Sequence, residues 1–206
     1  MNQDYLKDIQ DIKMIMSERT RFLSLSGMSG ILSGTYALIG AYIAFRMVRS
    51  ADSVAYRDLQ SGFLSPIIIK LIILAGIILI LSLVTAYYFT LRKAKVRNEN
   101  IWSPAAFKAL KSFGVPLVTG GIFILLLIWR GEILLISPST LIFYGIALYS
   151  ASTYTHRDVA TLGILEIVLG LLSMPFPGTG LYFWVIGFGV LHIIYGAIMH
   201  FKYDRQ

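Results

Sequence analysis

Long apolar blocks dominate this chain and restrict the folds that it can adopt. A helix needs about 20 apolar residues to cross the hydrocarbon of a bilayer, with a range of roughly 17–25. The first, second and last blocks reach that length, and the three between them are shorter. We expect an all-α integral membrane protein, a six-helix transmembrane bundle. Four spans with re-entrant segments are the alternative. The blocks lie at 23–46, 66–89, 114–130, 138–155, 160–175 and 180–200.

Composition agrees with a membrane location. Hydrophobic residues make up 56% of the 206 positions, and only 14% are charged, against roughly 25% in soluble domains. Charge is therefore too scarce to solvate a globule of this size. The chain contains no cysteine, which excludes disulfides and thiolate metal sites. We expect no cleavable signal peptide, because residues 1–22 mix acids and bases and contain no apolar run.

The distribution of lysine and arginine predicts the orientation of a membrane domain over 23–206. If all six blocks span, 13 of the 18 basic residues lie on the side that holds both termini, the 90–113 loop and the 156–159 turn. The opposite side receives 5. Basic residues concentrate in cytoplasmic loops, so we expect both termini in the cytoplasm. The net charge of +7 is explained in this way without a nucleic-acid partner.

Two further helices are expected outside the apolar blocks. Within 1–22, apolar side chains recur at three- and four-residue steps, which predicts a cytoplasmic amphipathic helix that packs on the bundle, the membrane surface or a partner. Ser103 and Pro104 are typical of a helix start, and Gly114 can end that helix. We therefore expect a short basic helix over 104–113 that contacts anionic lipid headgroups.

Glycines recur seven residues apart, which places both members of each pair on one face of a helix. Small residues let membrane helices approach closely, since lipid offers no hydrophobic drive for association. Packing within the chain is the favoured interpretation, and a homo-oligomer seam is the alternative. The blocks also resemble repeated helical hairpins, each with glycines and a proline-containing turn. The pairs are Gly27 and Gly34, Gly114 and Gly121, Gly163 and Gly170, Gly180 and Gly187, and Gly189 and Gly196.

The second half of the chain carries a resemblance in its glycine and aromatic positions. The stretches are LIFYGIALYSAST, LGILEIVLGLL and GLYFWVIGFGVLHIIYGAIM. They resemble a group of uncharacterised small bacterial six-span membrane proteins. Their rhythm is loosely similar to that of the acid-resistance membrane proteins of enteric bacteria. The resemblance implies a multi-pass protein of the bacterial inner membrane, and it supplies neither a substrate nor a site residue.

Two ionisable residues lie within the last two blocks. Ionisable residues inside a span are costly and are candidates for function. At 1.5 Å per residue, Glu166 lies about 9 Å and His192 about 12 Å from the cytoplasmic ends of their blocks. Since these blocks are antiparallel neighbours, we expect the two side chains to meet, either as a structural pair or as a proton or ligand site. Tyr195 and Tyr149 are the candidate hydroxyl partners, with Ser173 as another.

No other pattern indicates catalysis or a cofactor. The sequence has no phosphate-binding glycine loop and no metalloprotease or hydrolase motif, so a membrane enzyme is disfavoured. Haem ligation by His192 is disfavoured, and so is a metal site made of His156, Asp158 and His200. The favoured function is therefore binding or translocation of a small molecule or an ion. A non-catalytic interaction or stress-protection protein, acting through partners or oligomerisation, is the alternative.

Overall fold

The computed structural model describes residues 26–49, 66–96 and 102–204, and every regular element within them is a helix. The predicted amphipathic helix at 1–22 lies outside the described residues. The final helical rod, residues 180–204, alternates between α-helical and π-helical turns. The elements are α2 (Gly27–Arg49), α4 (Pro66–Val96), α5 (Pro104–Trp129), η2 (Ile133–Leu135), α6 (Ile136–Ser152), α7 (Arg157–Ser173), α8 (Gly180–Trp184), η3 (Val185–Leu191), α9 (His192–Met199) and η4 (His200–Asp204).

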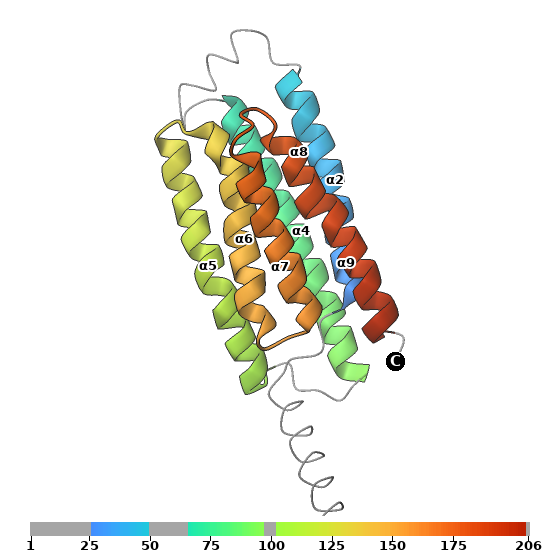
Figure 1. The fold of residues 1–206 in the computed structure, drawn as a ribbon. Helices are drawn as coiled ribbons and strands as arrows, with labels where there is room; N and C mark the ends of the chain where they lie inside the picture. Colours follow the sequence, from blue (N-terminus) through green and yellow to red (C-terminus); the bar gives the residue numbers. More distant parts are fainter. Residues whose placement is uncertain (1–25, 50–65, 97–101, 205–206) are drawn as a thin grey trace, which may run out of the picture.

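The helices lie side by side and alternate in direction along the chain (Figure 1). Five of them are long and apolar enough to cross a membrane. The remaining helix, α7, has 17 residues. The described residues thus form an all-helical structure with several apolar helices of spanning length, as expected for a multi-pass membrane protein. The five are Gly27–Arg49, Pro66–Val96, Pro104–Trp129, Ile133–Ser152 and Gly180–Asp204.

The start of α5 confirms one local prediction and corrects another. The Ser103 side chain accepts a hydrogen bond from the Ala106 amide at 3.1 Å, and Pro104 occupies the first helical position. The helix does not end at Gly114, however, but continues to Trp129. A separate basic helix over 104–113 was therefore wrong, and much of the predicted 90–113 loop is helical. An interior glycine costs only about 1 kcal/mol, whereas lipid penalises every backbone group that a broken helix exposes.

Glycines mark two of the turns between helices. Gly131 (φ 77°) follows α5, and Gly178 (φ 83°) precedes the final rod. Both occupy the left-handed region, which a residue without a β-carbon adopts at little cost. Both glycines lie in gaps between the predicted apolar blocks, at 131–137 and 176–179. At the other end of the molecule, α6 and α7 are joined by the short segment that was predicted around His156.

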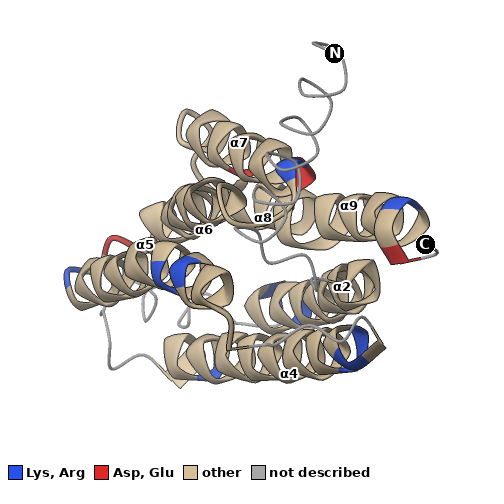
Figure 2. Cartoon of the chain, turned by 90° about the horizontal axis from the view of Figure 1, so that it is seen from below, with Lys and Arg blue, Asp and Glu red and all other residues tan. Residues whose placement is uncertain are grey.

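The helices pack as two groups joined by the final rod. In one group, α2 lies between α4 and the final rod, and in the other, α6 lies between α5 and α7. Figure 2 shows the same two groups from the end where the final rod terminates. The final rod contacts both α6 and α7, so it connects the groups. Any polar residue on its inner face is therefore shared by the two halves of the molecule.

Within each group, glycines lie where two backbones approach most closely. A β-carbon added at Gly145 on α6 would lie 2.5 Å from the carbonyl oxygen of Gly163 on α7. A β-carbon at Gly34 on α2 would lie 2.7 Å from the carbonyl oxygen of Gly189 in the final rod. Gly121 on α5 differs, since no atom of the described residues lies within 4 Å of such a β-carbon.

Candidate functional site

The carboxyl group of Glu166 is enclosed at the junction of the two helix groups. Glu166 lies on α7, and its side chain has 0% exposure. A β-carbon at Gly187 would collide with this carboxyl group and would lie 2.5 Å from Cδ2 of Leu141. Glycine at position 187 therefore makes the space that the carboxyl group fills. Within the described residues, neither carboxyl oxygen has a hydrogen-bond partner.

His192 of the final rod faces Glu166, as the matching depths predicted. Its Nδ1 lies 3.4 Å from Oε1 of Glu166 and 3.0 Å from the carbonyl oxygen of Gly187. The first distance is within ion-pair range but longer than a usual N–H···O bond of about 2.7–3.2 Å. The other ring nitrogen, Nε2, lies 2.8 Å from the hydroxyl oxygen of Tyr144 on α6. Three helical segments thus contribute one ionisable or hydroxyl group each.

The carbonyl oxygen of Gly187 determines which imidazole nitrogen carries the hydrogen. A carbonyl oxygen can only accept, so the 3.0 Å contact requires that Nδ1 of His192 carries a hydrogen and donates it. In the neutral ring, Nε2 is then an acceptor, and the Tyr144 hydroxyl donates to it. This assignment follows from hydrogen-bond geometry, in which one neutral ring nitrogen donates and the other accepts. The nitrogen that gains or loses a proton is therefore Nε2.

The local backbone geometry explains the contact between His192 and Gly187. The two residues are five apart: Gly187 lies within the π-helical segment η3 (Val185–Leu191), and His192 follows its last residue. A π-helical turn is wider than an α-helical turn and pairs residues five apart. Such turns are rare overall, and those that occur are often found at functional sites. In this chain the wide turn brings a backbone acceptor beside the histidine ring.

Aromatic rings surround Tyr144 and His192. The Tyr144 ring lies 4.9 Å from the Phe188 ring and 6.0 Å, edge-on, from the Phe113 ring. The Phe188 ring also stacks on His192 at 5.8 Å. Aromatic pairs at such distances are favourable and fix ring orientation. Phe113 and Phe188 therefore hold the Tyr144 hydroxyl towards Nε2.

The hydroxyl partners that we expected from the sequence are not the ones that the structure brings to the pair. The Tyr149 side chain is 53% exposed on the outside of α6, and Tyr195 lies a turn beyond His192, towards the end of the rod. Ser173 donates to the carbonyl oxygen of Gly170 in its own helix. Sequence reasoning missed Tyr144. It lies eight residues before Ser152, the end of α6, and so at about the same 12 Å depth as His192.

A second polar cluster joins helix ends at the side where the final rod terminates. The Asp204 carboxylate accepts hydrogen bonds from the Ser26 hydroxyl at 3.0 Å and the Gly27 amide at 2.9 Å. It also accepts from Lys93 at 2.7 Å and lies 3.1 Å from Nδ1 of His200. A carboxylate at a helix N-terminus is stabilised by the free amides and the helix dipole. Asp204 therefore ties the beginning of α2 and the end of α4 to the final rod.

Asp158 of α7 makes the corresponding contact with the final rod. Lys202 and the Tyr203 hydroxyl bond to its carboxylate at 2.9 and 2.8 Å, and the His156 ring stacks on the Tyr203 ring at 4.1 Å. Asp158 precedes the apolar stretch of α7. These bonds tie the start of α7 to the end of the final rod.

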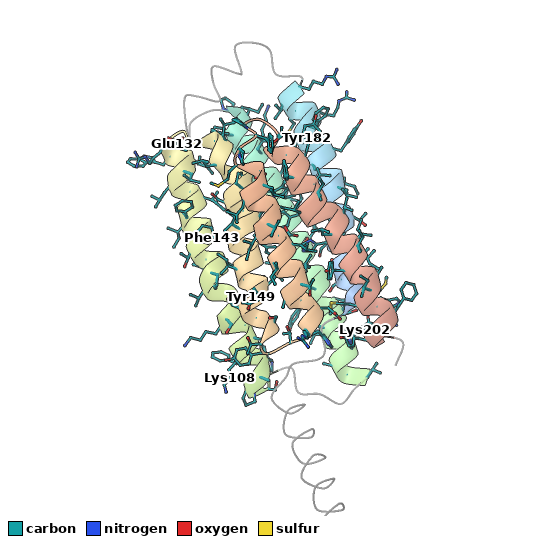
Figure 3. All side chains as sticks on the ribbon, viewed as in Figure 1. Lys108, Glu132, Phe143, Tyr149, Tyr182 and Lys202 are labelled. Atoms are coloured by element: carbon teal, nitrogen blue, oxygen red, sulfur yellow. The ribbon has the colours of Figure 1, made fainter. Side chains whose placement is uncertain are left out.

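These pairings do not assemble the metal site considered from the sequence. His200 pairs with Asp204, whereas Asp158 pairs with Lys202. The part of the chain that the structure describes contains no group of three or more histidine and carboxylate side chains that could hold a metal ion. Figure 3 places Lys202 at the same end of the molecule as Lys108, away from Glu132 and Tyr182.

Fold and site together define a multi-pass helical membrane protein with an ionisable pair buried where its two helix groups meet. No protein-family model, curated protein or solved structure matches the chain. The role of the buried pair must therefore be inferred from the chemistry of the chain's own residues.

Proposed function

We propose that the protein crosses a bacterial inner membrane six times, with α7 as the sixth span and both termini in the cytoplasm. At 1.5 Å per residue, 17 residues extend about 26 Å, close to the roughly 30 Å of the hydrocarbon core. The alternating helix directions place the start of α2 and the end of the final rod at one end (Figure 1). Lysine and arginine residues gather at that end, where α4 ends and α5 begins (Figure 2). This distribution supports the orientation predicted from the loops.

We further propose that the protein binds and translocates protons, with Glu166 and His192 as the proton-binding pair. The observation that carries this proposal is the fully buried carboxyl group at 3.4 Å from an imidazole nitrogen. Ionisable groups within a membrane span mark ion and proton pathways. The carboxyl group has no exposed surface, which favours a proton over a larger solute within the expected class of small molecules and ions.

Proton loss changes the net charge of the Glu166–His192 pair, and this change affects the packing of the two helix groups. A lone buried carboxylate or imidazolium is costly, whereas a neutral pair or an ion pair avoids an uncompensated charge. Removing one proton from the pair leaves a net negative charge between the two helix groups. The contact between α7 and the final rod is thus weakened when the proton leaves. Proton binding is in this way linked to the packing of the two groups.

The test is proton flux in vesicles that contain the purified protein and an entrapped pH-sensitive dye, driven by a potassium diffusion potential. The wild-type protein should carry a flux above that of empty vesicles, and Glu166→Gln should abolish it. Glu132→Gln is the matched control, because it removes an exposed carboxylate in the turn after α5 and should leave the flux intact. Equal flux in the wild type and Glu166→Gln, or wild-type flux no greater than that of empty vesicles, would refute the proposal.

A further inference from the structure

We infer that Tyr144 is the group through which His192 gains and loses its proton. This inference rests on the proposed function, and it assigns a role to a residue on a third helix. The hydroxyl oxygen of Tyr144 lies 2.8 Å from Nε2 of His192. That distance is typical of a well-formed hydrogen bond. Tyr144 therefore touches the atom that changes its protonation state.

Each of the three groups has a separate role in this arrangement. Gly187 binds the hydrogen on Nδ1 of His192, so that nitrogen keeps its proton. Glu166 faces the same Nδ1 and is placed to balance the positive charge of the imidazolium. Only Nε2 can then accept a proton in the neutral ring, and the Tyr144 hydroxyl faces it. Tyr144 is thus the relay, and Glu166 is the counter-ion.

The relay step is balanced in protons and charge. The Tyr144 hydroxyl transfers its proton to Nε2 of His192 while its oxygen takes a proton from a hydronium ion on the opposite side, which becomes water. Two O–H bonds break, one in the tyrosine and one in the hydronium ion, while the N–H bond and a new tyrosine O–H bond form. The imidazolium then stands opposite the Glu166 carboxylate. Release follows the same steps in reverse, so the relay is unchanged after each cycle.

The aromatic neighbours make Tyr144 better suited to this role than any tyrosine chosen from the sequence alone. Rings of Phe113 and Phe188 lie on the Tyr144 ring and hold its orientation. Tyr149 is on the same helix, five residues later, with its side chain 53% exposed on the outside of the molecule. The two tyrosines differ in surroundings but not in chemistry. Tyr149 is therefore a matched control for Tyr144.

The experiment compares Tyr144→Phe with Tyr149→Phe in two measurements on reconstituted protein. The first is proton flux, as above. The second is the infrared carboxylate band of Glu166, which should shift when the facing imidazolium forms; it is followed as pH is varied and identified by its loss in Glu166→Gln. Tyr144→Phe should lower the flux by about 10²-fold, the lower end of the contribution of a positioned proton-transfer group. It should leave the pH-dependent shift of the carboxylate band in place, because the Glu166–His192 pair remains. Tyr149→Phe should change neither reading.

The outcomes separate this inference from the proposed function. If Glu166→Gln abolishes the flux but Tyr144→Phe carries as much as Tyr149→Phe, the relay is wrong and the proton site stands. If Glu166→Gln carries wild-type flux, the proposed function itself is wrong. If Tyr144→Phe also abolishes the pH-dependent shift of the Glu166 carboxylate band, Tyr144 is a structural support of the pair and the relay assignment is overturned.

Discussion

Helix α7 makes two contacts that differ in kind. Against α6, its Gly163 meets Gly145 with backbone on backbone. Against the final rod, its Glu166 occupies the space that Gly187 leaves, and its oxygens have no hydrogen-bond partner among the described residues. The contact between Gly163 and Gly145 has one arrangement, since helix backbone atoms cannot move aside as a side chain can. The second contains a group with two charge states. Under the proposed function, we expect α6 and α7 to stay together while the contact between the two groups responds to protons.

The largest effect is expected where backbones touch. In Gly163→Val, the new side chain would begin 2.7 Å from the carbonyl oxygen of Gly145 and 2.8 Å from the amide nitrogen of Tyr149. Overpacking typically costs about 1–3 kcal/mol and more when backbone must move, so we expect little folded protein. The measurement is the yield of monodisperse protein and its melting temperature in detergent. Gly121→Val is the control, because its β-carbon has open space. Equal behaviour of the two variants would contradict the rigid contact.

A smaller effect is expected where a side chain, not backbone, meets the new atom. Gly187→Ala brings a methyl group onto the Glu166 carboxyl group and near Leu141, and should destabilise the protein by about 1–3 kcal/mol. Adding Glu166→Ala to Gly187→Ala should recover part of this loss, because the colliding group is gone. Unfolding in mixed detergent micelles, analysed as a double-mutant cycle, measures the coupling. Strict additivity would show that the two residues are not in contact.

Replacing the carboxyl group should separate stability from function. Glu166→Leu removes a buried group whose oxygens lack partners within the described residues. The neutral imidazole of His192 keeps its bonds to Gly187 and Tyr144, so no unpaired charge is left and the stability to unfolding should be unchanged or rise by about 1 kcal/mol. Proton flux should nevertheless disappear. Unfolding midpoints and vesicle flux measured on the same preparation provide the comparison. A strongly destabilised variant would mean that Glu166 is a structural residue.

The smallest effect is expected at the polar cluster of the helix ends. Asp204→Asn weakens bonds to Ser26, Gly27 and Lys93 and should cost about 1 kcal/mol. Hydrogen exchange should rise in the first turn of α2, whereas the glycine contact between Gly34 and Gly189 should keep the rest of the helix protected. Asp158→Asn, at a more exposed carboxylate, is the comparison variant and should leave α2 unaffected. Faster exchange along the whole of α2 would mean that Asp204, and not the glycine contact, is the main contact that stabilises this helix.

The sequence predicted how deep a residue lies along its helix, because depth depends only on its position in the chain. The rise of a helix fixes depth, so the positions of Glu166 and His192 along their blocks are enough to pair them. Rotation about the helix axis is set by packing, and for this reason Tyr149 was chosen where Tyr144 faces the histidine. Gly114 was assigned as a helix end because glycine often ends helices in water-soluble proteins. In lipid the continuing helix is the cheaper state, which explains why α5 does not stop there.

The bonds of Asp204 have a consequence for how the protein is made. The first described helix, α2, has its opening amide bonded to Asp204 and its glycine face against Gly189 and Gly196 of the final rod. The ribosome synthesises these partners after all the other described helices. During membrane insertion, the first amide and the glycine face of α2 therefore have no partner until the final rod is inserted. A chain that stalls before residue 180 would leave the glycine face of α2 without the helix that covers it.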